Sequence, residues 1–488
     1  MPGANSYISL HSNHMCMHEL GLQNGASASA SELKIGYVGG GSQGWAHTLI
    51  NDLGQCSDLS GEVALYDVDY EAATRNAEFG NRVMERADAV GEWRFEAYQE
   101  MDATLSAADF VVCSIQDPPD ETFKHDLDVP QEYGVYQTVG DTVGPGGTIR
   151  ALRAIPQYRE IAATVREECP DAWVINYTNP MTVCTRALYA EFPDINAIGL
   201  CHEVHPFQEL FAEIAERYIK TAEDIDREEI DVTVKGINHF TWIDAADWAG
   251  HDLYGYLDAE LERRKPLPGY EPGDMADESY WTNQFQIAFD LYDRFGVLGA
   301  AGDRHLAEFV PWYLSIDAPE EIQRWGIRLT PSSARVGGET PDKMMAARVD
   351  EFEFTESGEE AIEIMRALLG IEPFKTHLNY PNQGQISNLP EDIIVETNAL
   401  LTGKGVTPLC AGDLPGEIHS MVKRHVTNQE TLIEAGIGGD LDLAFQAFLN
   451  DPLVTLKREH AEELFTRLVE IEREYFTDYD LQNATVLE

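Results

Sequence analysis

Basic residues are scarce in this chain of 488 residues. Lysine and arginine together number 34, of which only ten are lysine, against 85 aspartates and glutamates, so the formal net charge is −51. Such a field repels nucleic acid and anionic membranes, and we exclude both as partners. The acidic residues are spread along the chain and form no block, which favours a halophilic surface over an interaction tail. A cation-binding acidic surface is the alternative.

Long apolar runs and paired cysteines are absent as well. No run approaches the roughly 18 residues that a membrane span needs, and the first residues lack the basic and apolar regions of an export signal. The seven cysteines are odd in number and show no paired spacing. We therefore expect no disulfide framework, a reducing compartment and a cytoplasmic location.

The predicted elements divide the chain into three parts. Residues 1–32 are small and polar, and we expect a disordered extension, with metal binding through its histidines as the alternative. Over residues 33–203 buried strands alternate with helices, which predicts an α/β fold with a Rossmann-type, doubly wound parallel sheet. Over residues 204–488 paired strands, a hairpin around "GKG" and long helices predict a mixed α+β metal and substrate domain.

A glycine-rich turn joins the first predicted strand to the first predicted helix. In Gly39-x-Gly41-x-x-Gly44, the first glycine allows a tight turn, the second lets the backbone approach a pyrophosphate, and the third lets helix and strand pack closely. Asp67 ends the second strand, where a carboxylate can hold ribose hydroxyls, and this favours NAD over NADP. A turn without a ligand is the alternative. The candidate cofactor-binding residues are Gly39, Gly41, Ser42, Gln43, Gly44 and Asp67.

Two further motifs follow predicted strands. In "VGDTVGPGGTIRALRAIP" we expect residues 144–147 to form a loop, with Arg150 and Arg153 in the first turns of the next helix. This loop is either a wall of the substrate site or a structural turn. Asn179 follows the fifth strand in "NYTNP". Because ligands of open α/β sheets bind at the carboxyl ends of strands, it can contact substrate hydroxyls; an ordinary turn and cap is the alternative.

The stretch "GLCHE" brings a cysteine, a histidine and a glutamate to the end of the sixth predicted strand. A thiolate with an imidazole suits a borderline divalent metal, while a catalytic thiol and chance are the alternatives. Because adjacent residues on a strand point to opposite faces, Cys201 and His202 should not bind the same ion. A second ligand must come from elsewhere, and "GINHFTW" offers His239 at the end of a later strand.

Together these motifs resemble glycoside hydrolase family 4. The resemblance runs through almost the whole ordered chain and includes "YVGGGSQGW", "NYTNPM", "GLCHEVH", "GINHFTW" and "NQGQISNLPEDIIVE". It implies a lactate/malate dehydrogenase-like C-terminal domain and a retaining α-glycosidase that needs NAD and a divalent metal, usually Mn²⁺. By the family's pattern, Cys201 and His239 bind the metal. Asn179 contacts sugar hydroxyls, and His202 lies where the leaving group is protonated.

The family's chemistry explains why a hydrolase would carry a nucleotide fold. It implies oxidation of the sugar at carbon 3 by NAD, elimination of the aglycone with the metal as Lewis acid, rehydration, and return of the hydride. The family supplies the base as a tyrosine or an aspartate from the helical region after the metal histidine. The candidates here are Tyr280, Asp290 and Tyr292.

The resemblance also bears on the substrate. After the fourth strand, "CSIQDPPDETFKHDLDV" is acidic where members that cleave phosphorylated glycosides need a phosphate pocket. The run from Cys201 to Val204, with Glu203 at the substrate, resembles the α-galacturonidase branch, and Arg304 can pair bidentately with a uronic acid carboxylate. A surface or capping role is the alternative for Arg304. We expect a galacturonide oligosaccharide as substrate and a homo-oligomer, a dimer or tetramer. The rival functions are an α-galactosidase or α-glucosidase and, in another class, a lactate- or malate-type dehydrogenase.

Overall fold

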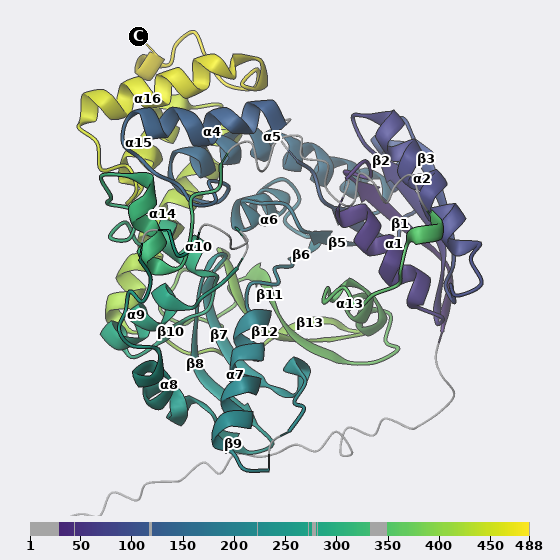
Figure 1. Ribbon diagram of the computed structural model, residues 1–488. Helices are drawn as coiled ribbons and strands as arrows, with labels where there is room; N and C mark the ends of the chain where they lie inside the picture. The colour runs from purple at the N-terminus through teal and green to yellow at the C-terminus, as the bar shows by residue number, and fades with distance from the viewer. Residues whose placement is uncertain are drawn as a thin grey trace, which may run out of the picture.

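The computed structural model describes residues 29–487, apart from 43, 117–119, 222, 272, 276–279, 281 and 332–348. Its centre is one continuous sheet (Figure 1). The parallel strands lie in the order β3-β2-β1-β4-β5-β6, which is the order of dinucleotide-binding folds. The predicted doubly wound parallel sheet is therefore confirmed. Its strands are β1 Ala30–Val38, β2 Leu59–Tyr66, β3 Glu92–Tyr98, β4 Phe110–Cys113, β5 Trp173–Asn176 and β6 Asn196–Gly199.

The sheet continues beyond β6 with antiparallel strands. β11 (Phe374–Pro381) pairs with β6 where Asn379 lies opposite Gly199, so the two halves of the chain share one sheet. The predicted paired strands and the hairpin are confirmed, whereas β11 was not predicted. The further strands are β7 Asp231–Ile237, β8 Phe240–Trp248, β9 His251–Asp252, β10 Leu298–Gly299, β12 Ile394–Thr402 and β13 Gly405–Pro408.

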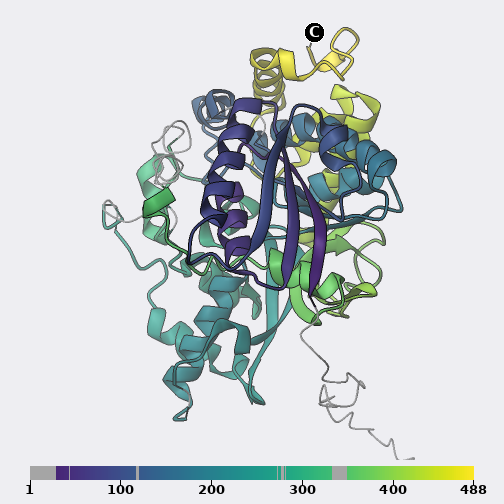
Figure 2. The same cartoon turned by 90° about the vertical axis from the view of Figure 1, so that its right-hand side faces the viewer.

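Helices cover both faces of the parallel strands, as the side-on view of the N-terminal strands shows (Figure 2). One face carries α5 (Gly144–Glu168), α6 (Met181–Glu191), α14 (Gly416–Gly438), α15 (Leu441–Asn450) and α16 (Arg458–Ile471). The other face carries α1 (Trp45–Gln55), α2 (Tyr70–Met84) and α13 (Ala361–Leu368). α13 comes late in the sequence yet lies beside α1 (Figure 1), so the second half of the chain contributes to the nucleotide-binding half.

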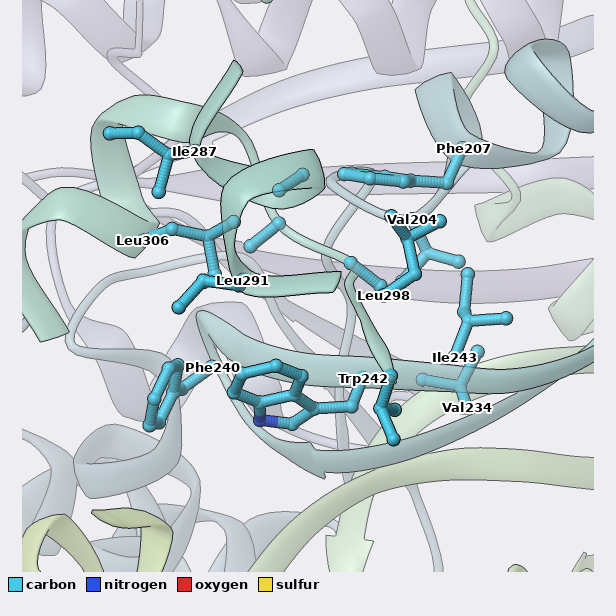
Figure 3. Packing of buried hydrophobic residues seen from close by; sticks show 14 of the residues in the cluster. Val204, Phe207, Val234, Phe240, Trp242, Ile243, Ile287, Leu291, Leu298 and Leu306 are labelled. Atoms are coloured by element: carbon cyan, nitrogen blue, oxygen red, sulfur yellow. The ribbon is translucent and has the colours of Figure 1, made fainter. Parts of the chain in front are cut away.

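A third apolar core lies over the antiparallel strands. Phe240 and Trp242 of β8 share a buried cluster with Phe207 of α7 (His205–Tyr218), Leu291 of α9 (Gln286–Phe295) and Leu306 of α10 (Asp303–Phe309) (Figure 3). Each such side chain contributes about 1.5–3 kcal/mol when it is fully buried. This core fixes the segments that carry the second half of the site. The remaining helices include α3 Met101–Leu105, α4 Asp120–Glu132 and α8 Leu257–Arg264.

The loop predicted at residues 144–147 is instead the first turn of α5. Pro145 fits there because the first N–H groups of a helix have no intrahelical partner. A Cβ on Gly146 would lie 2.6 Å from the carbonyl oxygen of Gly140, and one on Gly147 would lie 2.4 Å from the carbonyl carbon of Thr142. The glycines thus let residues 140–142 pack against the start of the helix, and the expectation that they break it is wrong.

Two compositional expectations can be compared with the structure. Every cysteine among the described residues is free. Within the same ranges, no helix is both long and apolar enough to cross a membrane. The extension predicted for residues 1–32 lies outside the described residues as far as residue 28, but residues 30–32 belong to β1, so its predicted end is wrong by about three residues.

Candidate active site

A cavity of about 580 Å³ lies at the carboxyl ends of β5 and β6. Asn179 comes just after β5, and the Cys-His-Glu run comes just after β6. His239 lies in the turn between β7 and β8, and Arg304 lies in the first turn of α10. The structure therefore brings together residues from four separate segments. The predicted site residues that line the cavity are Asn179, Cys201, His202, Glu203, His239 and Arg304.

Three of the groups at this cavity form a cluster of metal-ligand type. Asp141, His239 and His305 each place one ligand atom within 4.8 Å of the others. The rings of His239 and His305 are stacked with centroids 3.8 Å apart. Asp141 and His305 were not predicted as ligands, although Asp141 belongs to the "VGDTVG" motif and His305 directly follows Arg304. Cys201 lines the same cavity but does not belong to this group of three.

His239 is held in a form that can bind a metal. The Thr142 hydroxyl donates to Asp141 Oδ1 at 2.8 Å, and its oxygen lies 3.2 Å from His239 Nδ1. Nδ1–H therefore donates to Thr142, which leaves the Nε2 lone pair as the ligand. Burial, and then the nearby His305 imidazole, lower the pKa of His239 to about 3. The ring is neutral at physiological pH, as a metal ligand must be.

Cys201 is not an activated nucleophile in this environment. Burial, and then the Glu396 and Glu203 carboxylates, raise the pKa of its thiol well above the usual value. A thiol of this kind is protonated at neutral pH, and a bound cation is the ordinary means of converting it to a thiolate. His377 Nε2 donates to the Cys201 carbonyl oxygen at 3.0 Å and holds this part of the loop. These features favour the metal-ligand interpretation over the catalytic thiol.

His202 and Glu203, which follow the end of β6, contact different partners. His202 Nδ1 lies 3.1 Å from Glu359 Oε1, and this hydrogen bond raises the pKa of His202. Glu203 Oε2 accepts from the Gly302 N–H at 2.6 Å, and Oε1 lies 3.7 Å from His305 Nε2. Burial alone would raise the pKa of Glu203, but the nearby imidazoles hold it below its usual value. Glu203 is thus an ionised group beside the metal-ligand cluster.

Asn179 has one buried polar atom to offer a ligand. Its side-chain oxygen is buried without a hydrogen-bond partner among the described residues. Its Nδ2 lies 3.5 Å from Asp141 Oδ2, and its backbone carbonyl accepts from Arg150 Nε at 2.8 Å. A buried polar atom of this kind costs free energy unless a ligand or water satisfies it. This placement agrees with the predicted contact to a sugar hydroxyl.

Arg304 is buried, so the alternative of a surface arginine is wrong. One terminal nitrogen donates to the Thr138 carbonyl oxygen at 2.6 Å and to the Thr330 hydroxyl. The Thr138 hydroxyl in turn donates to the Arg304 carbonyl oxygen at 2.5 Å. The guanidinium is therefore fixed in place, and Arg304 is one of the residues that line the cavity.

The structure does not bring the candidate bases into this cavity. Asp290 is buried on α9, where Arg294 Nε donates to it at 2.7 Å and the Tyr313 hydroxyl donates to it at 2.7 Å. The Tyr280 hydroxyl accepts from Arg328 Nη2 at 2.9 Å. Tyr292 donates to Asp258 at 3.0 Å. None of the three is among the described residues that line the cavity, so the identity of the base stays a prediction.

The predicted cofactor loop has the tight turn that its motif requires at the first of its three glycines. Gly39 has a φ of +93°, and a Cβ there would lie 2.3 Å from the Ser114 carbonyl oxygen. The Gly41 N–H donates to Asp67 Oδ2 at 2.9 Å, so the carboxylate lies beside the loop. Gly44 has no atom within 4 Å of an added Cβ, so its expected packing role is wrong. The neighbouring Gly40 is the crowded position, because a Cβ there would lie 2.7 Å from Leu65 Cβ of β2, so Gly40 lets the turn pack against that strand.

The other two candidates in the loop can be placed only in part. The Ser42 N–H donates to the Gly39 carbonyl oxygen at 2.9 Å, which closes the turn. Gln43 lies outside the described residues.

Known proteins resemble this chain over nearly its full length. Residues 34–217 match the family described as Family 4 glycosyl hydrolase, and residues 234–454 match the Family 4 glycosyl hydrolase C-terminal domain. An alpha-galacturonidase from Thermoanaerobacterium saccharolyticum is 43% identical over 461 residues, which cover 92% of this chain and 98% of that protein.

Solved structures share the fold. The crystal structure of a putative glucosidase from Bacillus subtilis is 44% identical, with a TM-score of 0.83, and the match covers 90% of this chain and 100% of that one. A 6-phospho-alpha-glucosidase from gut microorganisms, in complex with NAD and Mn²⁺, has a TM-score of 0.74 at 19% identity, covering 92% and 100%. The chain therefore belongs to family 4 of the glycosyl hydrolases.

Proposed function

We propose that this chain is an α-galacturonidase that works with NAD and a divalent metal, with Mn²⁺ as the expected ion. The observation that carries the proposal is one cavity that joins metal-ligand groups to a fixed, buried arginine. A relative that is 43% identical over nearly its whole length is an alpha-galacturonidase. A neutral α-galactoside or α-glucoside is the alternative substrate.

The donor set of the cavity fits a borderline divalent ion. Two imidazoles, one carboxylate and one thiol are available from His239, His305, Asp141 and Cys201. We propose His239 and Cys201 as ligands, with Asp141 and His305 as further donors. A divalent cation bound here supplies a Lewis acid next to the sugar.

The loop after β1 fits a dinucleotide. Gly39 and Gly41 let the loop pack closely against Ser114 and Asp67 just before α1, where the N–H groups at a helix start can bind a pyrophosphate, and Asp67 offers a carboxylate to the ribose hydroxyls. Bound NAD supplies a reversible hydride acceptor, which agrees with a hydrolysis that has no net redox change.

The remaining residues orient the sugar and move protons. Asn179 offers its buried oxygen to a sugar hydroxyl, and Glu203 is a second acceptor at the same wall. Arg304 can bind the uronic acid carboxylate through charge-assisted hydrogen bonds. His202, half-exposed in the cavity, is the proton donor to the leaving group. Tyr280 lies two residues before Thr282 of the cavity wall, and Tyr280 and Asp290 stay our predicted bases.

Hydrolysis of p-nitrophenyl α-D-galacturonide, compared with the α-D-galactoside and the α-D-glucoside, tests this proposal. The assay contains molar KCl, NAD⁺, Mn²⁺ and a thiol reductant, and each component is omitted in turn. We expect release from the uronide that is lost without NAD⁺ or metal. Preference for a neutral sugar would refute the substrate. Stoichiometric accumulation of NADH would favour a dehydrogenase.

The setting and assembly of the enzyme form a separate proposal. We propose a halophilic, cytoplasmic homo-oligomer with a nucleotide-binding domain over residues 33–203 and a metal and substrate domain over 204–488. The net charge of −51 and the free described cysteines support the first two points. Unfolding temperatures measured from about 0.1 to 3 M KCl should rise with salt, because the Debye length shrinks from about 10 Å to about 3 Å or less. Light scattering gives the oligomeric state.

A further inference from the structure

A segment far away in sequence holds the loop that follows β6. Glu359 Oε1 lies 3.1 Å from His202 Nδ1, and the next residue, Glu360, has its Oε1 3.2 Å from His205 Nε2. Two consecutive carboxylates thus contact two imidazoles that flank Glu203. Glu360 is fixed further by the Thr376 hydroxyl and by Arg227 Nη1 at 3.5 Å. Glu359 and Glu360 therefore hold the loop that follows β6 through His202 and His205.

The same segment is bonded to α1, the helix that follows the cofactor loop. The Thr355 N–H donates to Asn51 Oδ1 at 3.0 Å, and the Ser357 hydroxyl donates to Asp52 Oδ2 at 2.9 Å. The Glu359 N–H donates to the Ser357 hydroxyl at 3.0 Å, which places the Glu359 backbone relative to the helix. The carboxylate that meets His202 thus comes from a segment tied to the nucleotide-binding half.

Glu359 and His202 line two different cavities and contact each other. His202 lines the active-site cavity, whereas Glu359 lines a second cavity of about 440 Å³. The Glu359 side chain is 14% exposed and the His202 side chain is 52% exposed, so the carboxylate is the fixed partner and the imidazole faces more open space. An ordinary surface ion pair has both groups in solvent and contributes little. In this pair the carboxylate is largely shielded from solvent, and the imidazole lines the active-site cavity.

We propose that Glu359 is a positioning residue for the proton donor His202. Its carboxylate accepts from His202 Nδ1–H, which fixes the ring and leaves Nε2 to serve the glycosidic oxygen. The two nitrogens of an imidazole lie on opposite sides of the ring, so a partner at one sets the direction and tautomer of the other. The inference rests on the proposed glycosidase function and goes beyond it by naming the residue behind the acid.

The test compares two leaving groups in variants of the full-length enzyme with NAD⁺ and Mn²⁺. The leaving group of methyl α-D-galacturonide is methoxide, a strong base that must be protonated as it departs. The p-nitrophenolate leaving group is a much weaker base and depends far less on protonation. Glu359→Ala should lower kcat for the methyl glycoside by about 10- to 100-fold, the range found for partners that orient a functional imidazole. The loss on the p-nitrophenyl glycoside should be several-fold smaller. Glu359→Gln still accepts a hydrogen bond and should retain more activity than the alanine variant.

Glu356→Gln is the matched control, because Glu356 is an exposed carboxylate on the same segment that lines the second cavity. It should leave both rates unchanged. A second readout is a double-mutant cycle with His202→Ala, in which adding Glu359→Ala should cause little further loss. Equal losses on both leaving groups, or additive losses in the cycle, would overturn the positioning role.

The result separates this inference from the proposed substrate. If the wild-type enzyme cleaves a neutral α-glycoside and no uronide, the substrate assignment fails, and the same leaving-group comparison on the accepted sugar still decides the role of Glu359. A wild-type enzyme inactive on every glycoside would overturn both.

Discussion

Two groups of buried polar residues lie near α5, and they differ in how positive charge is supplied. In the first, which we call the arginine triad, Arg153 Nη2 binds Asp126 Oδ2 at 2.7 Å, and Nη1 binds Glu472. All three side chains are fully buried. The triad joins α4 and α5 to the segment after α16. In the arginine triad the cation is the Arg153 side chain, and solvent has no access to the group.

In the second, the metal-ligand cluster, Asp141, His239 and His305 gather lone-pair donors at a cavity wall. A buried carboxylate and two imidazoles offer lone pairs to a cation from solution, whereas the carboxylates of the triad already have a guanidinium as their cation. The comparison teaches that burial of charge alone does not mark a functional site. A ligand site is marked by lone pairs that converge on a cavity.

Removal of a predicted ligand should have the largest effect on activity. His239→Ala should lower metal-dependent turnover by more than about 100-fold, because the cation loses an imidazole that Thr142 holds in the ligand form. Turnover is measured in excess Mn²⁺, and circular dichroism checks the fold. An EDTA-stripped variant with wild-type activity would refute the metal assignment.

The arginine triad should respond in stability instead. Arg153→Met leaves two buried carboxylates without their cation and should lower the free energy of unfolding by about 3–5 kcal/mol. Urea denaturation measures this loss. From the sequence, the segment with Arg153 is either a wall of the substrate site or a structural turn. The burial of Arg153 in the triad argues against a role in substrate binding. If Arg153→Met raises KM and leaves the free energy of unfolding unchanged, Arg153 belongs to the substrate site after all.

A matched pair of aspartates sharpens the contrast. Asp126→Asn should cost about 1–3 kcal/mol of stability, because a charge-assisted bond to Arg153 is lost in a buried site. Asp141→Asn should instead weaken Mn²⁺ binding by about tenfold or more, since a ligand carboxylate is lost. Calorimetric titration and urea denaturation are run on both variants. An exchange of the two outcomes would contradict the division into two kinds of cluster.

Arg304 tests the boundary between the two kinds of cluster, because it is a buried cation at the wall of the ligand cavity. Arg304→Lys keeps the charge but loses the planar fork, so KM for the galacturonide should rise about tenfold. KM for any neutral galactoside that is cleaved should not change. A loss of stability like that expected for Arg153→Met, without a change in KM, would make Arg304 structural.

The parallel half of the fold was readable from the sequence, whereas β11 was not. Five of the six parallel strands contain a short apolar run, and β3 alternates charged with apolar residues, so these patterns identify them. β11 carries Thr376, His377 and Asn379 at buried positions, and these polar residues disrupt the apolar pattern. They are buried because neighbouring elements supply their partners, as Cys201 does for His377. Such partners belong to the tertiary structure and leave no local signal.

The site, like the fold, was predictable from the sequence only in part. The places of Asn179, Cys201 and His239 at strand ends and the family resemblance indicated the motif residues, but only the fold brings Asp141, His239 and His305 within reach of one another. The aspartate in "VGDTVG" and the histidine in "GDRH" were the available signals. The ion pair of Asp290 with Arg294 has the i, i+4 spacing that could have argued against Asp290 as a base.

The most direct test of the central claim is a calorimetric titration of the EDTA-stripped chain with Mn²⁺, run in parallel on His239→Ala and Arg153→Met. We predict one ion per wild-type chain, loss of binding in His239→Ala, and retention in folded Arg153→Met. Equal binding by the wild type and His239→Ala, or no binding by the wild type at millimolar Mn²⁺, would contradict the account.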